Sequence, residues 1–104
     1  MLLLSAQSQA GFLSGNELLQ YCESNENGPL NTCYGYIAGA NDYQQAMAGW
    51  GYLDKPYYCA SEGVATGQLV KVVTKYLNEH PENLHLVAGS LVANALYYAF
   101  PCSP

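Results

Sequence analysis

The chain has 104 residues, half of them hydrophobic, and carries a net charge of −5 because eight Asp and Glu face three Lys and no Arg. This length allows one domain with a small core. The scarcity of cations argues against binding to nucleic acid or to an anionic membrane surface, and the high apolar content argues against disorder.

Residues 1–11 are predicted to be a leader, and residues 12–104 a single helical domain. The chain opens with the apolar stub Met1–Leu4, followed by small residues that end in Ser8-Gln9-Ala10. This pattern is typical of the end of a signal peptide, although the basic and full apolar regions are missing. The sequence therefore predicts export, and the alternative is an ordinary ragged terminus. No other segment is apolar over the length needed to insert into a membrane.

The first predicted helix begins after Ser14, because Ser14 and Glu17 form the S-x-x-E pattern of a capping box. This short helix ends at Cys22, and the polar segment 24–29 is predicted to be a turn.

The second predicted helix spans about residues 30–48 and carries Gly35 and Gly39 four residues apart. Each glycine costs about 1 kcal/mol in a helix relative to alanine. The pair therefore predicts that another backbone approaches this face closely.

Residues 49–58 break the helical pattern, because they hold two Gly, one Pro and four aromatic residues. Trp and Tyr dominate the residues that contribute most to protein–protein binding. A loop of this composition favours a binding surface, and the alternative is that Trp50 packs into the core.

The third and fourth helices are the clearest. Apolar residues recur at helical spacing from Leu69 to Leu77, with Thr66 as the expected N-cap, and the helix ends before Pro81. The same spacing recurs from Ala88 to Ala99. The predicted fold class is therefore all-α, a small bundle of four principal helices.

Four cysteines stand far apart in the sequence and lack the close pairs of a zinc site, so two disulfides in an oxidising compartment are favoured. If helices three and four are antiparallel, Cys59 and Cys102 lie side by side, while Cys22 and Cys33 flank the first turn. The expected pairing is Cys22–Cys33 and Cys59–Cys102, one of three connectivities. The chain-entropy model gives about 3 and 4 kcal/mol of stabilisation for the two loops.

The enzyme motifs G-x-S-x-G, H-E-x-x-H and the P-loop are absent from the sequence. Glu79 and Glu82 lie around a turn, where carboxylates more commonly solvate a helix end than act as acid and base. We therefore expect no catalytic residue, no metal and no cofactor. An enzymatic alternative requires a free cysteine thiol.

Several segments, in order and spacing, resemble one family over about residues 12–102. The most specific are C-Y-G-Y-I-A-G at 33–39, Y-L-N-E-H-P at 76–81 and A-F-P-C at 99–102. Together they resemble the Rap/Tai family of type VI secretion amidase-immunity proteins. The resemblance implies a small periplasmic helical protein with disulfides, often a homodimer. It also implies a cognate partner, a papain-like peptidoglycan amidase whose substrate groove the protein plugs.

The surface expected to bind this amidase combines the aromatic loop with neighbouring residues of the second helix. Its residues are Trp50, Tyr52, Asp54, Tyr57, Tyr58, Tyr36, Tyr43 and Asp42. The two aspartates are expected to meet a basic rim on the partner and to speed association. The alternative function is a periplasmic acid-stress chaperone that exposes apolar surface when its carboxylates become protonated.

Overall fold

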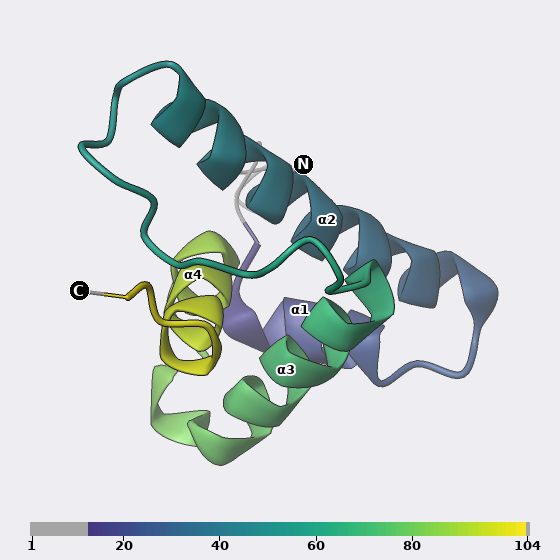
Figure 1. Cartoon of the computed structure of the whole chain (residues 1–104). Helices are drawn as coiled ribbons and strands as arrows, with labels where there is room; N and C mark the ends of the chain where they lie inside the picture. Colours follow the sequence, from purple (N-terminus) through teal and green to yellow (C-terminus); the bar gives the residue numbers. More distant parts are fainter. Residues whose placement is uncertain (1–12, 104) are drawn as a thin grey trace, which may run out of the picture.

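The computed structural model describes residues 13–103, so the predicted leader lies outside the described residues. The all-α prediction is confirmed: four α-helices and a short 3-10 helix account for the regular structure of these residues (Figure 1). They are α1 (Gly15–Cys22), α2 (Asn27–Gly49), α3 (Thr66–Glu79), η2 (Pro81–Asn83) and α4 (Ala88–Ala99). The helix α1 packs chiefly on α2, and α3 packs chiefly on α4.

The capping box at the start of α1 is confirmed. The backbone N–H of Ser14 donates to Oε1 of Glu17 at 3.0 Å, and the backbone N–H of Glu17 donates to Oγ of Ser14 at 3.2 Å. The backbone N–H of Gly15 also donates to the carbonyl of Leu86 at 2.9 Å. The first turn of α1 is therefore fixed to the connection that leads into α4.

Two predicted helix starts were wrong. The helix α2 begins at Asn27, so Pro29 lies in its first turn, where a backbone N–H has no intrahelical acceptor and a proline is tolerated. The N-cap of α3 is Ala65, and Thr66 is the first helical residue. No side-chain hydrogen bond caps this end of α3.

The end of α2 depends on Gly51, whose φ of 84° lies in the left-handed region that glycine adopts at little cost. The backbone N–H of Gly51 donates to the carbonyl of Ala48 at 3.2 Å, and that of Tyr52 donates to the carbonyl of Met47 at 3.0 Å. These two bonds form a Schellman motif. The motif turns the chain sharply away from the helix axis.

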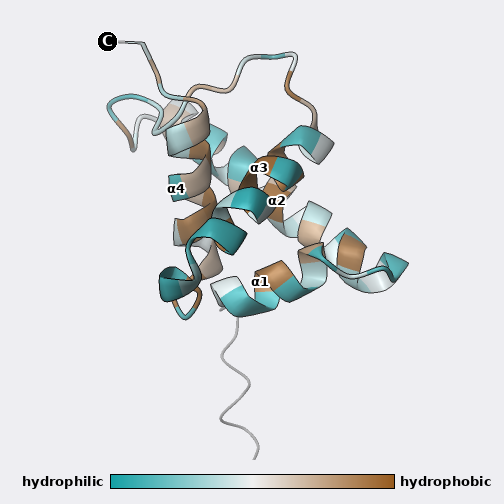
Figure 2. Cartoon of the chain, turned by 90° about the horizontal axis from the view of Figure 1, so that it is seen from below, coloured by the Kyte–Doolittle hydropathy of each residue, from teal (hydrophilic) through white to brown (hydrophobic). Residues whose placement is uncertain are grey.

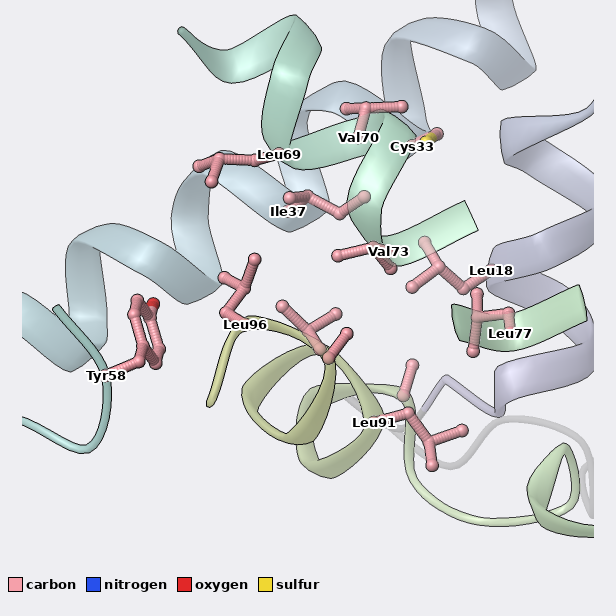
Figure 3. Packing of buried hydrophobic residues seen from close by; sticks show 13 residues of the cluster. Leu18, Cys33, Ile37, Tyr58, Leu69, Val70, Val73, Leu77, Leu91 and Leu96 are labelled. Carbon is pink, nitrogen blue, oxygen red and sulfur yellow. The ribbon is translucent and has the colours of Figure 1, made fainter. Parts of the chain in front are cut away.

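Side chains from all four helices meet in one core (Figure 3). Leu18, Ile37 and Leu96 are fully buried, and Val73 of α3 packs among them. Burial of a side chain of this size contributes about 1.5–3 kcal/mol. Hydrophobic residues recur along the whole of α4 (Figure 2), which supplies five of the thirteen core residues.

Both expected disulfides are confirmed. Cys22–Cys33 joins α1 to α2, and Cys59–Cys102 joins the connection between α2 and α3 to the segment after α4. All four cysteines take part in these two bonds, so the chain presents no free thiol of the kind that the enzymatic alternative requires. Within residues 13–103, no helix combines the length and apolarity needed to cross a bilayer.

The close approach expected at Gly35 and Gly39 is not made within the described chain. A Cβ placed on either glycine meets no atom within 4 Å. Gly15 shows the opposite environment, since a Cβ there would overlap the buried side chain of Leu91 and would lie 3.0 Å from the carbonyl oxygen of Leu84.

We therefore expect opposite effects from alanine at these positions. Gly15→Ala should lower the free energy of unfolding by about 1–3 kcal/mol, because the core must move to accept a methyl group. Gly35→Ala should raise it by about 0.5–1 kcal/mol, because alanine favours the helix and meets nothing. Chemical denaturation monitored by circular dichroism measures both. A loss of stability in Gly35→Ala would contradict the open environment of this helix face and would indicate that a second molecule packs there.

Candidate functional site

The connection between α2 and α3, residues 50–65, is the most prominent irregular segment of the described chain. It swings outward from the end of α2, returns past α4 and then joins α3 (Figure 1). Residues 50–56 form the outer part of this connection, here called the loop tip.

The loop tip exposes two large aromatic side chains. Trp50 is 67% exposed and Tyr52 is 71% exposed. Their ring centroids lie 6.3 Å apart in an edge-to-face arrangement. The alternative that Trp50 packs into the core is therefore wrong. Asp54, also expected to contact a partner, is exposed in the same segment.

Tyr58 fixes the inner end of the loop. Its side chain is 3% exposed, and its hydroxyl donates to Oδ1 of Asn41 on α2 at 2.7 Å. Burial, together with the negative charge of Asp42, raises the pKa of Tyr58 to about 12. The expectation that Tyr58 contacts a partner directly does not fit this position, because the residue belongs to the core (Figure 3). Its hydroxyl is satisfied inside the chain, which is what burial of a tyrosine requires.

Cys59 adds two further links at the same point. Its backbone N–H donates to the carbonyl of Phe100 at 2.8 Å, and its side chain forms the disulfide to Cys102. The loop tip is thus held between the Schellman turn at Gly51 and these links.

Tyr57 faces α4. Its ring stacks on that of Tyr97 with centroids 4.9 Å apart, and its hydroxyl donates to Oδ1 of Asn94 at 3.4 Å. Nearly half of its side-chain surface remains exposed. Tyr57 therefore connects the loop to the outer face of α4.

The expected residues of α2 lie apart from the loop tip. Tyr36 and Tyr43 line a groove of about 530 Å³ between α2 and α4, and no loop residue contributes to it. Burial raises the pKa of the Tyr36 hydroxyl, and a hydrogen bond to the backbone of Gly89 opposes this shift. Tyr43 is strongly exposed, and Asp42 is exposed on the same helix.

The sequence reasoning missed two exposed tyrosines on α4. Tyr97 is 43% exposed and Tyr98 is 71% exposed. A signal was present, because both fall outside the helical spacing of Leu91, Ala95 and the other buried residues of α4. A large aromatic residue outside that spacing must face solvent or a partner.

A family model described as Rap1a immunity proteins matches residues 14–102. This match covers nearly all of the described chain and confirms the resemblance on which the partner was inferred. No curated protein matches the chain.

The burial of Tyr58 predicts a specific loss of stability in alkali. Its pKa of about 12 in the folded chain exceeds the ordinary value of 10.0, so folding favours the protonated hydroxyl. The stabilisation that the buried, protonated hydroxyl adds to the free energy of unfolding is complete below pH 10 and is lost as pH rises from about 10 to 12. Between pH 9 and 11.5, the free energy of unfolding measured with denaturant should fall less in Tyr58→Phe than in the parent chain. In a spectrophotometric titration, the same variant should lack the last tyrosine to ionise.

Proposed function

Because the chain belongs to the Rap1a immunity proteins, we propose that it binds and inhibits a peptidoglycan amidase delivered by type VI secretion. In this proposal the protein acts in the periplasm and protects the cell that produces it. Its cognate partner is a papain-like cysteine amidase, and inhibition consists of blocking the substrate groove of that enzyme.

The observation that carries the proposal is the loop tip. Trp50 and Tyr52 are exposed on a segment whose two ends are fixed, so the backbone that carries the rings is restrained before a partner arrives. Ordering in advance lowers the entropic cost of association. A narrow aromatic projection of this kind fits a concave site such as a substrate groove better than a flat surface.

Two further properties support the location and the mode of association. Both pairs of cysteines form disulfides, as is common in oxidising compartments such as the periplasm. The net charge of −5, with Asp42 and Asp54 exposed near aromatic residues, favours rapid association with a basic rim. A homodimer, implied by the family resemblance, belongs to the same proposal, and sedimentation velocity tests it.

Removal of the loop tip's rings should weaken binding without unfolding the chain. The probe is a papain-like peptidoglycan amidase, to be sought first in an open reading frame beside this gene that encodes a Cys–His pair. For the double variant Trp50→Ala/Tyr52→Ala we expect an increase in Kd of about 30-fold or more, because exposed Trp and Tyr are typical hot spots. Isothermal titration calorimetry measures Kd, and the thermal melt should stay within about 2 °C because both side chains lie outside the core.

Tyr34→Ala serves as the matched control, since Tyr34 is an exposed tyrosine of α2 that lines neither the groove nor the loop. Its Kd should match that of the parent chain. If the parent chain fails to bind the amidase but suppresses aggregation of a client protein at low pH, the proposal is wrong and the chaperone alternative is favoured.

A further inference from the structure

Five rings form a continuous row across the outer faces of α3 and α4. Successive centroids lie 4.9, 5.3, 6.3 and 4.3 Å apart. The row, here called the aromatic ridge, consists of Tyr57, Tyr97, Tyr98, Tyr76 and His80. None of its members except Tyr57 was expected to contact a partner.

The ridge is ordered and remains accessible. Tyr76 packs against the core, and Tyr57 is held by Asn94, so the row is fixed near both ends. Tyr98, in its middle, is nevertheless 71% exposed. Stacked rings have already lost much of their rotamer freedom on folding, so a partner that contacts them does not have to order them.

Two hollows flank the ridge. One, of about 250 Å³, lies between α3 and α4 and includes Val72, Ala95 and Tyr98 in its lining. The other, of about 390 Å³, lies beside Tyr97 and includes Pro56 in its lining. Each hollow has room for an apolar side chain, and partner side chains that fill such hollows are typical of binding hot spots.

The charges at the two hollows differ. Lys75 at the smaller hollow is paired with Glu79 at 2.9 Å. Lys55 at the larger hollow makes no ion pair with any residue between 13 and 103. It is an exposed cation beside the rings of Tyr57 and Tyr97 in a chain with a net charge of −5. A carboxylate on the partner is the group that complements it.

We propose that the aromatic ridge is a second contact surface for the amidase effector. The effector places an apolar side chain in the hollow beside Tyr97 and a carboxylate opposite Lys55. This inference rests on the proposed function. The same partner reaches both surfaces because Tyr57 follows the loop tip directly and also begins the ridge, so a protein seated on the tip extends onto α4.

Two charge reversals of equal size test the carboxylate that we propose on the effector. Lys55→Glu and Lys71→Glu each change the net charge by two, but Lys71 is exposed on α3 and lines neither hollow. With the same papain-like amidase as the probe, Lys55→Glu should raise Kd about tenfold at low salt, and less at high salt. Lys71→Glu should change Kd by less than about twofold, because its charge lies outside the interface.

The contact of the effector with the middle of the ridge is tested by Tyr98→Ala, whose side chain is too exposed for its loss to unfold the chain. We expect an increase in Kd of about tenfold or more, with an unchanged thermal melt. Equal changes of Kd in the two charge-reversal variants, or an unchanged Kd in Tyr98→Ala, would overturn the proposal that the ridge contacts the effector. Either result would leave the proposed function intact. If Tyr98→Ala alters self-association in sedimentation while Kd stays constant, the ridge serves a second copy and the inference is wrong.

The proposals for the loop tip and for the ridge can be contradicted separately. If Tyr98→Ala weakens binding whereas Trp50→Ala/Tyr52→Ala does not, the ridge is supported and the two exposed rings of the loop tip are not the inhibitory element. If the parent chain binds no amidase at all, both the proposed function and the ridge are wrong.

Discussion

The position of the aromatic loop depends chiefly on one point of attachment, where Tyr58 and Cys59 fix it to the helices. A hydrogen bond to Asn41 holds the loop to α2, and the disulfide to Cys102 holds it to the chain that follows α4. Without these links, a segment rich in aromatic residues would gain conformational freedom and would bury its rings where it could. Because the links form on folding, most of the cost of ordering the loop tip is met before any partner binds.

The helix α4 shows how a small core and an exposed aromatic surface can share one element. Its inner face, including Leu91 and Leu96, is fully buried, whereas Tyr97 and Tyr98 turn outward. Stacking of these rings on their neighbours from the loop and α3 covers part of their apolar area, and Tyr97 and Tyr98 nevertheless remain exposed. A tyrosine suits this position because its polar end is solvated while its face remains available for contact.

The sequence predicted those parts of the fold that follow from local pattern. The helical period located α3 and α4, and antiparallel packing of short-linked helices was enough to select the correct disulfide to Cys102. The predictions that were wrong concern positions where composition has two physical readings. Pro29 can end a turn or occupy the first turn of a helix. Likewise, Gly35 can signal a close approach or an open helix face, and only the neighbours in space distinguish the two.

The sequence likewise predicted only part of the candidate site. Composition alone located the aromatic loop, but a loop has no period, so the sequence did not distinguish the buried ring from the exposed ones. The difference between Tyr58 and Trp50 is a hydrogen-bond partner within the chain. Tyr58 can be buried because Oδ1 of Asn41 accepts a hydrogen bond from its hydroxyl, whereas burial of an unpaired polar group costs about 1–3 kcal/mol. Trp50 lies at the end of α2, where the Schellman turn directs the chain away from the core. Its ring is therefore 67% exposed, and in the proposed complex a site on the effector completes its contacts.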